Sequence, residues 1–323
     1  MALPEQLINA LRLPVIGAPM FLVSFPPLVT AICKAGLVGS FPHINARPSE
    51  QFDEWLTTIA DDLKAHREAH PDAVTGPLAV NLVVHRSNPR FKPDLEIVVK
   101  HEVPLVLTSL GGPREVVEAV HSYGGLVFCD VVNPTHARKA AAAGVDGIIC
   151  IGGGAGGHAS IQSSFSLVRQ IREFWDGCLI LGGAINDGYQ IRAAETLGAD
   201  LAYVGTRFLM TQESNAQDEY KHMILEADVE NLVYTDRLSG VGCNFLKPSL
   251  DRYGIVPEDL PPKQPDLSSL IDTEAKLWRD IWTAGHGVAT IHDVPSVGTL
   301  VDRLEQEYRA ACALSVSRAI RSA

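Results

Sequence analysis

Two stretches of the chain decide how it folds: Ala143-Gly-Val-Asp146 leading into Gly147-Ile-Ile-Cys-Ile151, and Leu197-Gly-Ala-Asp200 leading into Leu201-Ala-Tyr-Val204. Each has a glycine where a helix would end in the left-handed conformation, and each continues into an apolar run. Because these runs are apolar at nearly every position, they predict strands buried on both faces. The near identity of the two stretches indicates repeated strand–helix units.

The same unit recurs through residues 14–227, where short apolar runs alternate with segments of helical period. Most of these segments begin at Pro, Ser, Thr or Asp, which fit the first turn of a helix; the last begins at Ser214. Antiparallel hairpin patterns are absent, so we predict a closed (β/α)8 barrel, an α/β fold, over an open doubly wound sheet. The predicted strands are Pro14–Pro19, Leu37–Phe41, Leu78–Val83, Leu105–Thr108, Leu126–Val131, Gly147–Ile151, Leu179–Leu181 and Leu201–Val204.

The alternation of apolar runs and helical segments ends at about Ala227. A Pro-rich stretch, Pro257–Pro265, precedes two segments with strong helical patterns, Asp272–Ala284 and Pro295–Ala313. We therefore expect residues 1–227 to form the barrel. Residues 228–323 are expected to form a mostly helical cap that packs over the barrel mouth and returns to the barrel.

Composition limits the classes of function. The 323 residues are 46% hydrophobic and 20% charged, which suits a folded protein with a large core. The net charge of −11 disfavours nucleic acids and anionic lipid surfaces. No apolar run could span a bilayer and no leader pattern is present, so we expect a cytoplasmic protein. The six cysteines form no CxxC pair, which indicates reduced thiols and no metal site.

Glycine-rich loops follow the last three predicted strands: Gly152–His158, Gly182–Ile185 and Gly205–Arg207. Functional groups of such barrels lie at the carboxyl ends of the strands, and the last two loops commonly bind phosphate. Glycine lets backbone N–H groups approach an anion closely. We therefore expect a phosphorylated ligand at Gly182, Gly183, Gly205 and Thr206; the alternative is that these loops are only tight turns.

Three side chains stand out near the predicted mouth. His158 follows the glycines directly and is a candidate acid/base, because imidazole titrates near neutral pH. The alternative is a histidine that merely hydrogen-bonds a loop carbonyl. Asn81 interrupts an apolar strand and could bind a heterocycle edge or a neighbouring loop. Met20 could lie against a flat ring, although on spacing alone simple core filling is the better explanation.

These residues together resemble the nitronate monooxygenase family, formerly called 2-nitropropane dioxygenases. The similarity runs from about Pro14 to the end of the chain, and the pairing of the AGGH and GTRF elements is specific. The matching segments are Pro14-Val-Ile-Gly-Ala-Pro-Met20, Val80-Asn-Leu82, Ala155-Gly-Gly-His158, Leu181-Gly-Gly-Ala-Ile185, Tyr203-Val-Gly-Thr-Arg-Phe208, Phe245-Leu-Lys-Pro-Ser249 and Ala284-Gly-His-Gly287.

The resemblance implies FMN in a barrel, with His158 as the catalytic residue and His286 as a substrate or lid residue. It implies no metal. The implied cofactor-binding residues are Ala18, Met20, Asn81, Asp130, Gly156, Gly157, Gly182, Gly183, Gly205 and Thr206. It also implies a reaction in which the histidine deprotonates a nitroalkane, or a nitronate binds directly, and O2 reoxidises the flavin. The products are a carbonyl compound and nitrite. The partners are a small-molecule substrate and O2, with a homodimer as a possible assembly.

Four positions depart from patterns seen in the family. Gly154 stands where some members have an acidic residue, Ser160 where some have Gly, Asp130 where some have Lys, and His286 where Gln is common. These departures leave the substrate open. Related FMN enzymes with the same histidine take electrons from NAD(P)H and reduce quinones or enoyl thioesters, which is the first alternative. A flavin-binding protein without turnover is the second.

Overall fold

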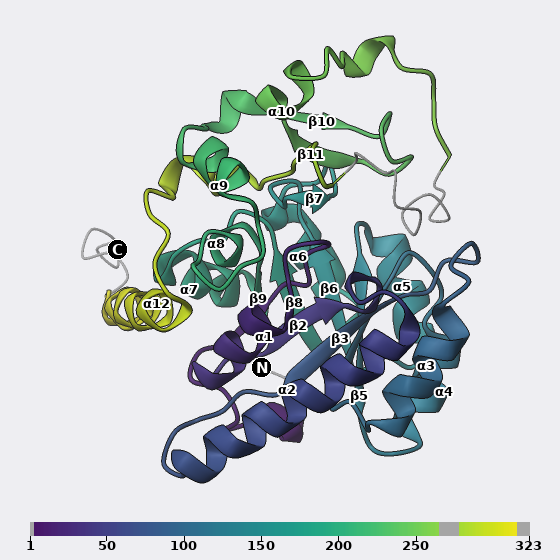
Figure 1. Cartoon of the computed structure of the whole chain (residues 1–323), viewed down its shortest axis with the longest axis vertical. Helices are drawn as coiled ribbons and strands as arrows, with labels where there is room; N and C mark the ends of the chain where they lie inside the picture. Colours follow the sequence, from purple (N-terminus) through teal and green to yellow (C-terminus); the bar gives the residue numbers. More distant parts are fainter. Residues whose placement is uncertain (1–2, 265–277, 315–323) are drawn as a thin grey trace, which may run out of the picture.

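The computed structural model describes residues 3–264 and 278–314, and its centre is a ring of eight parallel strands (Figure 1). The sheet order is β1-β9-β8-β6-β5-β4-β3-β2, and a parallel bridge between Ile16 and Val38 brings β1 beside β2. The predicted (β/α)8 barrel is therefore confirmed. The strands are β1 Val15–Gly17, β2 Gly39–Pro42, β3 Leu78–Val83, β4 Leu105–Ser109, β5 Leu126–Val131, β6 Gly147–Ile151, β8 Cys178–Gly182 and β9 Leu201–Val204.

Helices follow the strands and surround the ring. They are α1 Pro26–Lys34, α2 Ser49–Ala69, α3 Phe91–Lys100, α4 Arg114–His121, α5 Pro134–Ala142, α6 Ser164–Arg172, α7 Gly188–Leu197, α8 Thr206–Leu209 and α9 Asp218–Leu225, with 3-10 turns η1 Glu5–Leu7 and η2 His43–Asn45. The predicted helix start at Ser214 is wrong. Its hydroxyl accepts a bond from the Ala216 N–H at 3.1 Å, so Ser214 shapes a turn and α9 begins four residues later.

The barrel strands alternate between two apolar layers. Outward side chains pack under the helices, whereas inward ones such as Phe128, Ile180 and Leu201 fill the barrel. Toward the carboxyl ends the inward positions become polar, with Asp130 two residues beyond Phe128 and Tyr203 two beyond Leu201. The apolar plug therefore ends in a polar floor at the mouth of the barrel.

A small antiparallel sheet lies above that mouth (Figure 1). It joins β10 Leu232–Thr235, β11 Cys243–Leu246 and β7 Gly157–His158, which comes from the loop after β6. Short helical elements flank the sheet: η3 Val229–Asn231, α10 Lys247–Asp251, η4 Pro257–Asp259 and η5 His286–Thr290. We retain the division of the chain at residue 227 as a proposal.

The predicted helix Asp272–Ala284 is wrong over its described part; residues 272–277 lie outside the described residues. Residues 281–284 run extended, because the Leu246 N–H bonds the Trp282 carbonyl at 2.8 Å and Thr283 forms an antiparallel bridge with Phe245. Tertiary hydrogen bonds here outweigh local helical period.

The last helix, α12 Val297–Ala313, matches its predicted range and packs against α7, where an added Cβ on Gly188 would lie 2.1 Å from the Tyr308 nitrogen. Among the described residues no helix has the length and apolarity to cross a bilayer.

Candidate active site

A cavity of about 900 Å³ opens at the carboxyl ends of the barrel strands and is bounded on its other side by residues of the cap such as Val241 and Gly285. The structure brings together almost all of the residues predicted from the sequence. The predicted residues that line the cavity are Ala18, Met20, Asn81, Asp130, Gly156, Gly157, His158, Gly182, Gly183, Gly205 and Thr206. His286 is exposed and does not line it, so its predicted role stays a prediction.

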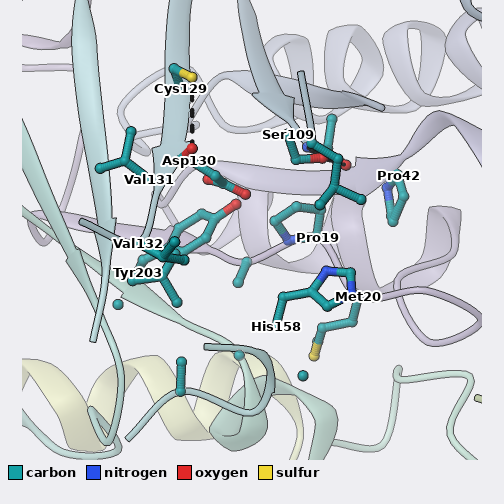
Figure 2. Close-up of a pocket in the computed structure, with 18 of the residues that line it drawn as sticks. Pro19, Met20, Pro42, Ser109, Cys129, Asp130, Val131, Val132, His158 and Tyr203 are labelled. Carbon is teal, nitrogen blue, oxygen red and sulfur yellow. Dashed lines mark hydrogen bonds between the residues drawn. The ribbon is translucent and has the colours of Figure 1, made fainter. Parts of the chain in front are cut away.

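His158 is positioned by a strand pairing and not by its own loop alone. It lies in β7 opposite Cys243, and the next N–H, of Ala159, donates to the Gly242 carbonyl at 2.9 Å. Its ring packs edge-on against the ring of Trp278, with centroids 5.7 Å apart and planes at 83°. Figure 2 shows the imidazole projecting into the cavity.

The chemistry of His158 follows from its surroundings. Its ring nitrogens have no hydrogen-bond partner in residues 3–264 and 278–314, so it does not serve as a tie to a loop carbonyl. Burial lowers the pKa of the imidazole to about 4. The ring is therefore neutral at physiological pH, and a substrate in the cavity would meet a base with a free lone pair.

The glycine loop that carries His158 is held from outside. The buried Asn244 side chain donates to the carbonyls of Gly153 and Ala155 at 2.9 and 2.7 Å. The Gly154 carbonyl accepts the N–H groups of Ala184 at 3.1 Å and His286 at 3.0 Å. One carbonyl thus joins three segments, and the loop is fixed although it is almost all glycine.

The loops after β8 and β9 have the properties of an anion cradle. Gly183 has φ +125°, which disfavours other residues, while an added Cβ on Gly205 would meet nothing closer than 3.7 Å. The N–H groups of Gly183 and Gly205 donate to no acceptor in the described part of the chain. The Thr206 hydroxyl accepts the Gly285 N–H at 3.0 Å and keeps its own proton to donate. Such unused donors fit a phosphate.

Two other predicted ligand residues, Asn81 and Met20, also line the cavity. The Asn81 amide donates to the Leu107 carbonyl and the Ser109 hydroxyl, both at 3.2 Å, so the structural role weighed for it is real. The Met20 backbone N–H bonds the Ser24 hydroxyl at 3.0 Å. Figure 2 shows the Met20 thioether at the cavity, where a flat ring could contact it.

Asp130 and Tyr203 form the floor of the cavity. Figure 2 shows the Asp130 carboxyl group and the Tyr203 ring pointing toward one another. Neither the Asp130 Oδ1 atom nor the Tyr203 hydroxyl has a hydrogen-bond partner in the described part of the protein, although both atoms are buried. Burial raises the pKa of Asp130 to about 7 and that of Tyr203 well above its usual value, where Asp130 adds a smaller effect.

Sequence reasoning missed Tyr203, Trp278 and Asn244 as site residues. Side chains two positions apart on a strand point to the same face, and Leu201 points into the barrel. The strand period could therefore have identified Tyr203 as an inward-facing residue. Trp278 and Asn244 lie far along the chain from His158 and have no motif of their own. Only the fold brings them to the site.

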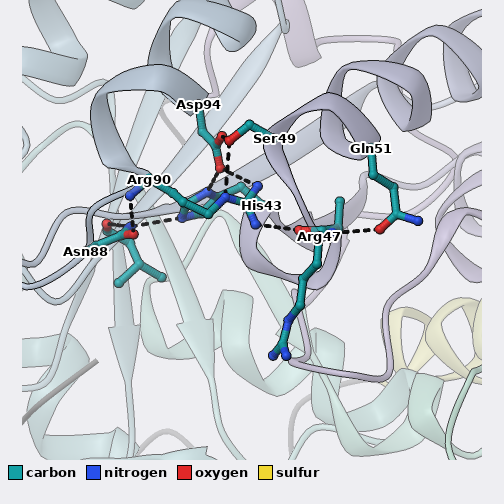
Figure 3. Close-up of polar contacts among 9 residues, drawn as sticks. His43, Arg47, Ser49, Gln51, Asn88, Arg90 and Asp94 are labelled. Atoms are coloured by element: carbon teal, nitrogen blue, oxygen red, sulfur yellow. Dashed lines mark hydrogen bonds and ion pairs between the residues drawn. The ribbon is translucent and has the colours of Figure 1, made fainter. Parts of the chain in front are cut away.

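A second cluster resembles catalytic machinery but is closed to substrate (Figure 3). The His43 Nδ1 contacts Asp94, which also accepts the Ser49 hydroxyl and pairs with Arg90 at 2.7 Å. The side chains of His43 and Asp94 are fully buried and do not line the cavity. The neighbours Pro42 and Ile44 do line it, so this network fixes one cavity wall.

Comparison with known protein families identifies the family of the chain. The sequence model of the nitronate monooxygenase family matches residues 5–307. The chain belongs to that family. It is therefore an oxidoreductase, in a family of flavin enzymes that oxidise nitronates.

Two relatives illustrate the similarity. It is 26% identical to the nitronate monooxygenase of Paraburkholderia phytofirmans, over 92% of each chain. It is 29% identical to the Rv1533 protein of Mycobacterium tuberculosis, over 69% of this chain but only 60% of that relative. The chain thus spans less than two thirds of that second relative.

Solved structures agree on the fold. Nitroalkane oxidase from Streptomyces ansochromogenes superposes with a TM-score of 0.77 at 25% identity, covering 95% of this chain and 99% of that one. FabK from Thermotoga maritima superposes with a TM-score of 0.75 at 20% identity, covering 96% and 97%. The FabK likeness shows the barrel fold alone.

The cavity fits the flavin that the nitronate monooxygenase family uses. Unused N–H donors at Gly183 and Gly205 suit a phosphate, and two unpartnered buried oxygens on the floor suit the polar edge of a ring. The volume of about 900 Å³ is within the range that holds a cofactor and a small substrate.

Proposed function

We propose that this protein binds FMN and oxidises alkyl nitronates and nitroalkanes with O2, yielding a carbonyl compound and nitrite. The observation that carries the proposal is a neutral, unpartnered His158 imidazole facing a cavity with a phosphate-type cradle. Membership of the nitronate monooxygenase family supports it.

The binding roles follow from the free groups of the cavity. Gly182, Gly183, Gly205 and Thr206 would hold the phosphate through N–H groups and a hydroxyl. The ring would lie near Ala18, Met20, Asn81 and Asp130, with Gly156 and Gly157 toward its face. When bound, FMN would supply the electron acceptor and the reaction with O2.

His158 would move the proton. The hydrogen on the carbon that bears the nitro group passes to a ring nitrogen of the imidazole, and the carbon–hydrogen electron pair delocalises into the nitro group to give a nitronate. Because burial disfavours the imidazolium, the site takes this proton only transiently. The ring of Trp278 packs against the imidazole and helps to hold its orientation.

The overall reaction balances without another reductant. Two nitronate anions and one O2 give two carbonyl compounds and two nitrite ions, so each carbon gains one oxygen atom and each carbon–nitrogen bond breaks. The barrel contributes orientation and shelter while the cofactor carries the redox step.

A visible spectrum of the purified protein, with identification of the released cofactor, is the first test. We expect a yellow protein that releases FMN. Anaerobic mixing with propionate 3-nitronate should bleach the flavin, and aerobic turnover should produce nitrite. Bleaching by NADH or NADPH but not by nitronate would favour the reductase alternative. A colourless protein that does not take up FMN would refute the proposal.

The non-catalytic alternative has its own test. His158→Ala should retain FMN and lose nitroalkane oxidation, with His222→Ala, an exposed histidine of α9, as the matched control. Unchanged activity in His158→Ala would indicate a flavin-binding protein without turnover. A cytoplasmic location, a homodimer and a lid role for His286 remain predictions beside this proposal.

A further inference from the structure

The floor of the cavity leaves two oxygen atoms without partners. The Asp130 Oδ1 and the Tyr203 hydroxyl each have less than 1 Å² of exposed surface and no hydrogen bond within the described residues. Leaving a buried polar group unsatisfied costs about 1–3 kcal/mol. Two such atoms at one place, pointing toward one another in Figure 2, indicate a ligand that completes them.

Their placement comes from opposite parts of the barrel. Asp130 ends the inward row of β5 and Tyr203 that of β9, and β6 and β8 separate these strands in the sheet. The two side chains therefore meet across the barrel interior and not as neighbours on one strand pair. A flat group lying over the barrel mouth could contact both.

Burial favours the neutral form of Asp130, and no facing charge opposes this effect. Tyr203 from β9, Cys129 from its own strand and His158 from β7 line the same cavity, and none of them is a cation near neutral pH. Arg114 of α4 and His136 and Lys139 of α5 also line the cavity, but none of them contributes to the pKa of Asp130. Burial alone accounts for the raised pKa of the carboxyl group, and no positive group opposes it. A carboxylic acid and a phenol both donate a proton, so the floor offers two O–H donors.

We infer that Asp130, as a carboxylic acid, and Tyr203 form a neutral donor pair that binds an acceptor edge of the flavin ring. The inference rests on the proposed flavin site and defines how this chain binds the ring. The ring carbonyl oxygens and unprotonated ring nitrogens of a flavin are acceptors, so they match the two donors. An ionised Asp130 would place lone pairs against those acceptors and would weaken binding.

A dependence of flavin affinity on pH follows. Ionisation of Asp130 in the free protein competes with flavin binding, so affinity should fall as pH rises through about 7, the pKa of Asp130. A fully coupled site loses about tenfold in affinity per pH unit above that value. From pH 6 to pH 8.5 the expected loss is therefore about 30-fold.

Riboflavin is the probe for the test, because it lacks the phosphate, whose own titration near pH 6 would interfere. The apoprotein is titrated with riboflavin between pH 6 and 8.5, and the dissociation constant is read from flavin fluorescence. FMN at pH 7.5–9 gives a parallel series in which the phosphate stays ionised. Neither measurement depends on enzyme activity.

The variants separate the two donors. Asp130→Asn keeps the shape and an N–H donor, so its affinity should be independent of pH. Tyr203→Phe removes one hydrogen bond and should bind about 3–10-fold more weakly at every pH while keeping the slope of wild type. Near-ultraviolet circular dichroism of each apoprotein checks the fold. If Asp130→Asn does not fold, the slopes of wild type and Tyr203→Phe still decide the question.

The outcomes are distinct. A falling affinity in wild type and a flat profile in Asp130→Asn would support the donor pair. A flat wild-type profile, or the same slope in Asp130→Asn, would overturn it while leaving the FMN proposal intact. Failure of wild type to bind riboflavin and FMN at any pH would overturn both.

Discussion

Replacing His158 by Ala should slow oxidation of neutral nitroalkanes by about 10²-fold or more, which is the usual contribution of a positioned base. This factor corresponds to an increase of about 2.7 kcal/mol in the activation free energy. Protonation of the imidazole does not limit this effect near neutral pH. With a pKa of about 4, the imidazole is protonated in only about one molecule in a thousand at pH 7, so essentially every wild-type molecule carries an active base.

The assay compares two forms of one substrate. A nitroalkane added in its neutral form needs the proton removed, whereas the pre-ionised nitronate does not. Initial rates of nitrite formation should therefore fall about 10²-fold for the nitroalkane and less than about 10-fold for the nitronate. The His222→Ala variant should change neither rate, because that side chain is exposed on α9.

The pH profile gives an independent check. A base acts when unprotonated, so activity is lost as pH falls through its pKa. For His158 that loss should occur near pH 4, leaving kcat/KM for nitroalkanes nearly flat on the acid side down to about pH 5. An inflection near pH 6.5, the ordinary histidine value, would contradict the burial argument. Equal losses for nitroalkane and nitronate in His158→Ala would refute the base role.

Three further variants test the cradle, the loop and the cavity wall. Gly205→Ala should fold normally, since its Cβ meets no atom within 3.6 Å, yet its affinity for FMN, measured by fluorescence, should fall about 10-fold because the methyl group enters the cradle. Asn244→Ala leaves the carbonyls of Gly153 and Ala155 unbonded and should lower the free energy of unfolding in urea by about 2–4 kcal/mol, with slower nitroalkane turnover. Asp94→Ala removes a largely buried ion pair with Arg90 and the buried contact with His43. It should cost about 3–5 kcal/mol in the same assay while FMN, once bound, keeps its spectrum; a change below 1 kcal/mol in either variant would contradict these assignments.

The barrel could be predicted because strands that are buried on both faces have continuous apolar sequences. Strands such as β6 Gly147–Ile151 and β9 Leu201–Val204 are continuous apolar runs, and their predicted bounds coincide with those observed. The strands of the cap could not be predicted in this way. Its strand β10 is partly exposed and only four residues long, and the pairing of Phe245 with Thr283 depends on segments far apart in sequence.

The site residues also fall into a group that the sequence could identify and a group that it could not. His158, Gly183 and Gly205 could be identified because a barrel places function at the ends of its strands, and glycine there has few structural reasons to recur. Asn244 and Trp278 could not be identified, because the role of a single asparagine or tryptophan depends on its contacts in the folded protein. The unpartnered state of Asp130 and Tyr203 is likewise a property of the packed barrel.

The position of His158 depends on the cap as much as on the barrel. The six residues before it include five glycines, and such a segment loses more backbone entropy on ordering than any other. The barrel contributes hydrogen bonds from Gly152 to Gly182 and from Ala184 to Gly154. The cap contributes the pairing of β7 with β11 and the two hydrogen bonds from Asn244. The cap therefore does more than cover the cavity, because without it the glycines would leave the imidazole free to move. A change that loosens β11 should lower turnover before it lowers flavin affinity, since the cradle at Gly183 and Gly205 belongs to the barrel.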